Sequence, residues 1–186
     1  MENNRTSIIR EIIPSLWDNH VPDMPEVSFF KVLEKDSGGN IIEKYLMINL
    51  KENSDDLTIE LSVSLNQNES EELLKAFKTL QNYVSKIIEK RNSPLYDPLF
   101  EKPYNACIKI KELEIGFTIG TGNQTSMAYI KIGPLHKEYS KLKLSDRIKS
   151  SLPLTVYKEF EFYKLKNFVD IFQKAFDDIF GEKESN

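Results

Sequence analysis

Two hydrophobic periods follow one another in the first half of the chain. Over residues 57–65, apolar residues alternate strictly with polar ones, which is the pattern of a strand with one wet face. The period then changes to 3.6 residues and predicts an amphipathic helix over 69–91. Asn68 followed by Glu71 predicts an N-cap with its reciprocal partner, and Pro94 lies just beyond the helix. The apolar face consists of Leu73, Leu74, Phe77, Leu80, Val84, Ile87 and Ile88.

The other apolar stretches of the first half are shorter. Residues 6–17 have apolar residues at helical spacing and predict a short helix, and 18–26, with two prolines, predicts a connector. Residues 27–35 and 41–50 predict strands joined by a hairpin turn at 37–40, whose two glycines tolerate positive φ. The first half therefore predicts a short helix, a three-stranded meander and a long helix.

The second half follows a similar plan of strands and then a helix. Alternating apolar residues predict strands at 106–110, 113–119 and 127–132. A strand at 154–162 leads into an apolar stripe at helical spacing, which predicts a closing helix over 164–180. No repeat is visible at the level of individual residues, so this similarity is one of architecture.

Together these elements predict the α+β class, with a mainly antiparallel sheet flanked by two long amphipathic helices in a single domain. The domain is expected to span residues 1–180, and 181–186 to form a disordered tail or a linker. No apolar run approaches the ~20 residues of a membrane span, and the N-terminus lacks a signal peptide pattern. We therefore expect a cytoplasmic protein with no membrane partner. The lone Cys107, among apolar neighbours, is expected to be a buried thiol.

The net charge of −4 is unevenly distributed along the chain. Residues 1–100 hold 11 Lys and Arg against 17 Asp and Glu, whereas residues 104–166 hold 11 against 6. The middle of the chain therefore has a positive surplus between acidic flanks. Such a surplus is typical of a surface that binds a polyanion, and equally of lysines that keep strand edges and loops soluble.

Catalytic and metal-binding motifs are not evident. The glycine-rich stretch 116–122 precedes a strand instead of opening a helix, so it predicts a hairpin and not a dinucleotide site. His20 and His136 are isolated, and the pairs Asp55-Asp56 and Asp177-Asp178 fit a turn and a polar helix face. We therefore predict no enzyme activity, no catalytic residue, no metal and no cofactor.

Binding is the remaining class of function. Several tyrosines lie within the basic middle, where aromatic rings can stack on bases while ammonium groups hold phosphates. The alternative is that these tyrosines are core residues and that the lysines only maintain solubility. The candidate contacts with nucleic acid are Tyr129, Lys137, Tyr139, Lys141, Lys143 and Lys149.

Three stretches carry a resemblance to a known family. The run 41–50, followed by a turn and by Leu61-Ser-Val-Ser-Leu-Asn-Gln67 into a helix, resembles the N-terminal DNA-recognition domain of McrB-type modified-cytosine restriction subunits. Residues 128–139 and Leu152-Pro153 before the closing helix are similar to its later half. That family commonly has a Trp after a Pro in its first strand. Phe29 is the nearest equivalent here, without a Pro immediately before it.

The resemblance covers roughly residues 7–180 and implies binding of duplex DNA, in which a modified cytosine is flipped out and stacked between aromatic or apolar groups. Phe29 would be one of these groups. The AAA+ GTPase that follows such domains is absent from this chain. The implied protein is a module of a restriction or phage-defence system, with an AAA+ or nuclease partner on the same or another chain.

Two other functions remain open. The repeated plan of sheet and then helix is similar to that of single-stranded nucleic-acid binders of the Whirly or PUR type. An acidic domain of this kind also fits a secretion chaperone or an immunity-type protein, which dimerises and binds a protein partner through a sheet edge or a helix face. Only the nucleic-acid functions require the basic middle.

Overall fold

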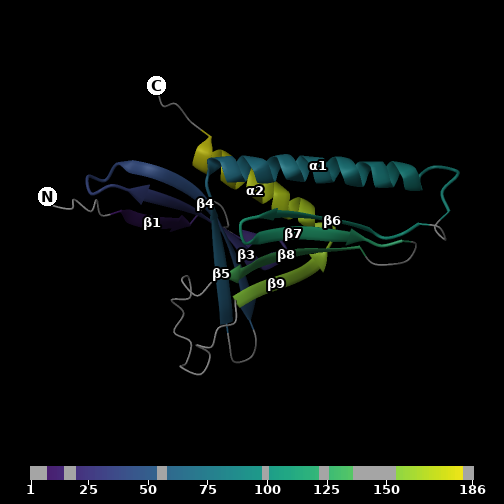
Figure 1. The fold of residues 1–186 in the computed structure, drawn as a ribbon, viewed down its shortest axis with the longest axis horizontal. Helices are drawn as coiled ribbons and strands as arrows, with labels where there is room; N and C mark the ends of the chain where they lie inside the picture. Colours follow the sequence, from purple (N-terminus) through teal and green to yellow (C-terminus); the bar gives the residue numbers. More distant parts are fainter. Residues whose placement is uncertain are drawn as a thin grey trace. The chain divides into compact units, whose positions relative to one another are not determined.

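The computed structural model has two antiparallel sheets and two helices, which confirms the α+β class. Most of its elements are labelled in Figure 1. The residues that the structure describes are 8–14, 20–53, 58–97, 101–121, 126–135 and 154–181.

Contacts divide the chain into two compact units. The sequence predicted one sheet, whereas the structure has two, because strands joined by short turns pair with each other and the long helix separates the two sets. Unit 1 comprises residues 1–49, 64–96 and 163–186, and unit 2 comprises residues 50–63 and 97–162.

The first sheet has the order β1-β3-β4-β5, and the short β2 also pairs with β3. The turn between β3 and β4 is held by Asp36, whose Oδ1 accepts hydrogen bonds from the backbone N–H of Gly38 and of Asn40, both at 2.9 Å. Gly39 has a φ of 85°, so the predicted hairpin and its need for glycine are confirmed. The strands are β1 Ile9–Pro14, β2 His20–Val21, β3 Met24–Lys35, β4 Ile41–Asn53 and β5 Thr58–Leu65.

The predicted helix over 6–17 is wrong, because residues 9–14 form the strand β1. β1 pairs antiparallel with β3, from Ile9 opposite Lys35 to Pro14 opposite Phe30. Isoleucines at 8, 9, 12 and 13 fit helical spacing, but β-branched side chains favour strands, and β3 supplies the backbone hydrogen bonds. The connector predicted over 18–26 likewise contains β2 and the start of β3.

The long helix α1 spans Gln67–Arg91 and begins two residues earlier than predicted. Its N-cap is Asn66 and not Asn68. The Asn66 side chain accepts from the Glu69 backbone N–H at 3.0 Å, and Glu69 accepts from the Asn66 backbone N–H at 2.8 Å. Both candidate pairs have the same spacing, but Asn66 is the residue that has extended backbone dihedrals directly after β5.

Four phenylalanines form the centre of unit 1. Phe29 of β3 lies 5.5 Å from Phe168 and 6.0 Å from Phe172, measured between ring centroids. Phe77 of α1 contacts the same two rings at 5.8 and 5.9 Å, mostly edge to face. Phe168 and Phe172 lie on α2, Lys164–Phe180, which Figure 1 shows beside α1. The cluster therefore joins one strand and both helices.

The buried stripe on α1 is narrower than the predicted one. Leu73, Leu74, Phe77 and Ile87 are buried, Leu80 and Val84 are half-buried, and Ile88 is 54% exposed.

Neither helix among the described residues has the length and apolar character needed to cross a membrane.

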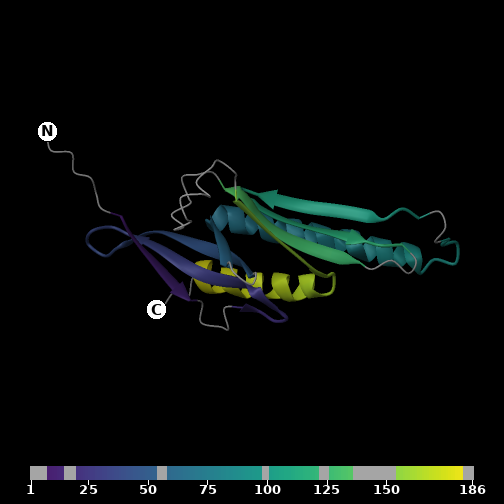
Figure 2. The same ribbon diagram turned by 90° about the horizontal axis from the view of Figure 1, so that it is seen from below.

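Unit 2 contains the second sheet, of order β6-β7-β8-β9, whose strands run side by side in Figure 2. More buried and more exposed residues alternate along β6 and through most of β7 and β9, as predicted for strands with one solvent-exposed face. Cys107 is exposed, so the predicted buried thiol is wrong: Ala106 and Ile108 face inward, and the residue between them faces outward. The strands are β6 Tyr104–Ile110, β7 Leu113–Ile119, β8 Met127–Leu135 and β9 Leu154–Glu161.

The phenylalanine cluster predicts a large cost for one substitution. Phe77→Ala is expected to lower the free energy of unfolding by roughly 3–5 kcal/mol, because the buried ring leaves a cavity beside Phe168 and Phe172. Ile88→Ala, on the exposed side of the same helix, is the control and should cost less than about 1 kcal/mol. Urea unfolding followed by circular dichroism measures both. An equal loss of unfolding free energy in the two variants would mean that the phenylalanine cluster does not stabilise the packing of the helices.

The two candidate caps are distinguished by a second pair of variants. Asn66→Ala should destabilise the protein by about 1 kcal/mol, because the backbone N–H of Glu69 in the first turn loses its side-chain acceptor. Asn68→Ala removes an exposed side chain inside the helix and should be close to neutral. Thermal unfolding of both variants tests this order, and a larger effect at Asn68 would restore the cap that the sequence pattern suggested.

Candidate functional site

The outward face of the second sheet is the most organised group of polar and aromatic side chains among the described residues of unit 2. Cross-strand pairing places Cys107 opposite Gly116, Gly116 opposite Tyr129, and Tyr129 opposite Glu159. The adjacent row consists of Lys109, Glu114, Lys131 and Tyr157. We call these two rows the open face.

Gly116 makes room for the ring of Tyr129. A Cβ on Gly116 would lie 2.6 Å from three atoms at the hydroxyl end of that ring, closer than real contacts allow. The ring therefore lies over the glycine, close to the backbone of the sheet. Any larger residue at this position would push the Tyr129 side chain away from the surface.

Tyr157 packs against Tyr129. The ring centroids are 5.4 Å apart with an interplanar angle of 32°, and Tyr157 is 43% exposed. Both hydroxyls are fixed by carboxylates: Tyr129 donates to Glu114 at 2.7 Å, and Tyr157 donates to Glu159 at 2.7 Å. The two rings form a preorganised aromatic surface that is partly open to solvent.

The pKa values reflect these hydrogen bonds. Partial burial and the bond to Glu159 raise the pKa of Tyr157 to about 12. Burial and the bond to Glu114 raise the pKa of Tyr129 as well. Bonds from Tyr129 and Lys131 hold the pKa of Glu114 below its ordinary range. At neutral pH, both tyrosines are therefore hydrogen-bond donors, and Glu114 is a charged acceptor.

The open face itself is not basic. Lys109 and Lys131 are balanced by Glu114 and Glu159, and Lys131 forms an ion pair with Glu114 at 3.3 Å. Most of the positive surplus of the middle of the chain comes from 136–153, which holds five Lys and Arg against two acidic residues. That stretch lies outside the described residues.

The residues predicted to contact nucleic acid lie in different parts of the structure, and most fall outside the described residues. Phe29 has no exposed surface and lies within the phenylalanine cluster, so it could not contact DNA unless that core opened. Tyr129 lies on the open face, as its alternation with Ala128 and Ile130 requires. The other candidates fall outside the described residues: Lys137, Tyr139, Lys141, Lys143 and Lys149.

Sequence reasoning did not select Gly116, Glu114, Glu159 or Tyr157 as parts of one site. A signal for Tyr157 was present, because it follows the inward Val156 and must face the same side as the outward residues of β8. The partner of each residue depends on the register of pairing, which alternation alone does not specify.

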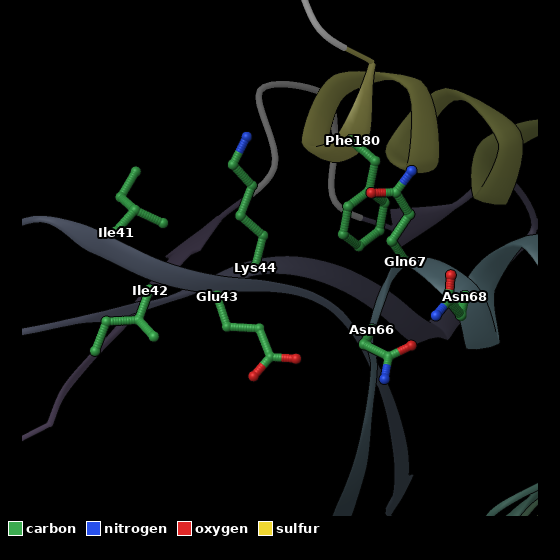
Figure 3. Close-up of a pocket in the computed structure, with 8 residues that line it drawn as sticks. All are labelled: Ile41, Ile42, Glu43, Lys44, Asn66, Gln67, Asn68 and Phe180. Atoms are coloured by element: carbon green, nitrogen blue, oxygen red, sulfur yellow. The ribbon is translucent and has the colours of Figure 1, made fainter.

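Two other kinds of candidate site, a metal-binding cluster and a pocket, have less support among the described residues. No group of three or more His, Cys, Asp or Glu within the described ranges could hold a metal. A hollow of about 520 Å³ opens at the start of α1, between β4 and the end of α2 (Figure 3). Two of the amides that line it are engaged within α1, since Asn66 caps the helix and Gln67 donates to Glu71 at 3.1 Å. Ile41, Ile42 and Lys44 on its β4 side are exposed.

Comparisons of this chain with protein-family models, with curated proteins and with solved structures found no match. The function of the open face must therefore be inferred from its own residues.

The hydrogen bond between Tyr157 and Glu159 predicts a pH effect. The folded-state pKa of Tyr157 is raised from 10 to about 12. The protonated Tyr157 hydroxyl therefore contributes its full stabilisation below about pH 10, and this stabilisation is lost as the pH rises to about 12. Glu159→Gln should lower this pKa and reduce the loss. Titration of tyrosinate absorbance, with Tyr157→Phe to identify the signal, measures the shift. An unchanged titration in Glu159→Gln would mean that the bond does not hold the proton.

Proposed function

We propose that this chain binds nucleic acid through the open face of unit 2, with an unpaired base stacked on the Tyr129–Tyr157 pair. The observation that supports this proposal is the pair itself. Two tyrosines contact one another on an outward sheet face, over a glycine, with their hydroxyls fixed by carboxylates. Aromatic rings on a sheet surface are a common means of binding single-stranded nucleic acid, because every base has a flat face to stack.

The rings favour an unpaired base over a paired one. A base inside a duplex is stacked on its neighbours and cannot lie against a flat sheet, whereas a base in a single strand or flipped from a duplex can. Tyr157 supplies the accessible surface because it is 43% exposed, and the ring of Tyr129 packs against it. Fixed rings lose little conformational entropy when they bind.

Phosphate contacts must come from beyond the two charge-balanced rows. The lysines at 137, 141, 143 and 149 are the candidates, because 136–153 has a positive surplus in the sequence and directly precedes β9, the strand that carries Tyr157. Each phosphate contact releases counterions, so these lysines should determine the salt dependence of binding.

The identity of the nucleic acid follows from the resemblance to McrB-type recognition domains. On that basis the unpaired base is a modified cytosine flipped from a duplex, and the chain serves a restriction or defence system. The alternative is a single-stranded nucleic-acid binder, which the same rings fit equally well. The two differ in whether duplex DNA with 5-methylcytosine is preferred.

A second candidate function is capture of a protein partner at β1, and a specific observation favours it. Within the described part of the chain, β1 pairs with β3 on one side only. Ile8, Ile9 and Ile12 on or next to it are each more than half exposed. An unpaired strand edge with exposed isoleucines can accept an added strand.

The first proposal predicts the behaviour of one tyrosine variant. Tyr157→Ala should weaken binding to a single strand or a methylated duplex about tenfold and leave the slope of affinity against salt unchanged, because stacking releases few ions. Tyr163→Ala is the matched control, since Tyr163 is 65% exposed but lies outside the open face. Fluorescence anisotropy with labelled single-stranded, unmethylated duplex and 5-methylcytosine duplex DNA at two salt concentrations measures both effects.

Lysine variants complete the same experiment. Replacing Lys137, Lys141, Lys143 and Lys149 together by Ala should weaken binding to all sequences and flatten the salt slope by roughly 0.7 to 0.9 per lost contact. The control removes as many exposed lysines from the two helices: Lys75, Lys78, Lys86 and Lys174. Equal affinity for all three DNAs, or an unchanged affinity in Tyr157→Ala, would refute the proposal. Failure to bind any DNA would leave β1 as the candidate interface.

A further inference from the structure

Glu159 is placed to read the edge of a base that lies on Tyr157. It is two residues from Tyr157 on β9, and its Oε1 accepts the Tyr157 hydroxyl proton at 2.7 Å. Cross-strand pairing also places it directly opposite Tyr129. The carboxylate therefore stands at the hydroxyl end of the accessible ring, beside the position that a stacked base would occupy.

One oxygen of this carboxylate is available to a ligand. Glu159 is exposed, and its Oε2 has no partner among the described residues. Glu114 differs, because Tyr129 occupies one of its oxygens and Lys131 the other. Of the two carboxylates that hold the tyrosine pair, only Glu159 has an oxygen without a hydrogen-bond partner among the described residues.

A charged carboxylate can only accept hydrogen bonds, and this restricts the edge that it recognises. The N4 amine of cytosine donates, whereas the O4 of uracil or thymine at the same position is an acceptor and would be repelled. The N3–H of uracil lies between two carbonyl oxygens, so a carboxylate that approached it would meet both. Replacing the acid by an amide removes this selectivity, because Gln both donates and accepts.

We propose that Glu159 is a specificity-determining residue, which makes the open face prefer a base with an exocyclic amine, such as cytosine, over uracil or thymine. This inference rests on the proposed function, since it requires that a base stacks on Tyr157. It concerns which base is selected, while the tyrosine pair provides stacking with any base.

The test compares two short single strands, one of deoxycytidine and one of deoxyuridine, bound to the full chain at slightly alkaline pH. The wild type should bind the deoxycytidine strand about fivefold more tightly, as expected for one hydrogen bond to an exposed charged group. In Glu159→Gln this ratio should fall to about one, while both affinities stay the same or rise because a negative charge is lost. A deoxycytidine strand dimethylated at N4, which has no N–H to donate, should bind the wild type no better than deoxyuridine.

Glu161→Gln is the matched control for charge. Glu161 lies two residues further along the same strand, opposite Met127, and its replacement removes the same charge from the same face. It should raise both affinities and preserve the ratio. If the wild type shows a ratio of one while Tyr157→Ala still weakens binding, this inference fails and the proposed function stands. If neither strand binds, the proposed function fails as well. A ratio unchanged in Glu159→Gln would assign the selectivity to another residue.

Discussion

The packing of Phe29 and Phe77 against Phe168 and Phe172 is the contact on which unit 1 depends. These residues come from β3, α1 and α2, so one set of rings connects segments separated by more than a hundred residues of sequence. Aromatic side chains bury large areas and gain further stability from edge-to-face contacts, so few residues can hold both helices on the strand. The same packing removes Phe29 from the surface and limits its role to the core.

Unit 2 follows a different constraint, the alternation of inward and outward residues in four antiparallel strands. Burying Ile115, Phe117 and Ile130 requires their neighbours to face outward, which gathers Gly116 and Tyr129 on one face. The absent side chain of Gly116 makes room for Tyr129, and Tyr157 then packs beside it. The candidate site is thus a direct consequence of how the sheet buries its other face.

In the proposed function, stacking and phosphate binding are assigned to parts of the chain that differ in charge. The carboxylates that fix the tyrosines balance the lysines of the same two rows, so the open face has no strong attraction for a polyanion. Most of the positive surplus is carried by 136–153 in the sequence. If the proposed function holds, this division makes base selectivity and salt dependence separable, because stacking and edge recognition release few ions whereas lysine–phosphate contacts release many.

The sequence by itself determined the elements with a strong hydrophobic period. In these elements the spacing of apolar residues places them on one side of a helix or of a strand, but not of both. They are the helices at 67–91 and 164–180, the meander of β3 to β5 and the strands of the second sheet. Tertiary contacts decided the rest. The isoleucines near the N-terminus fit either period, and pairing with β3 made them a strand. Asn66 and Asn68 offer equal caps until the end of β5 selects one, and Cys107 has apolar neighbours but faces outward. The open face depends on strand register, which brings residues 114, 116, 129, 157 and 159 together although no local pattern links them.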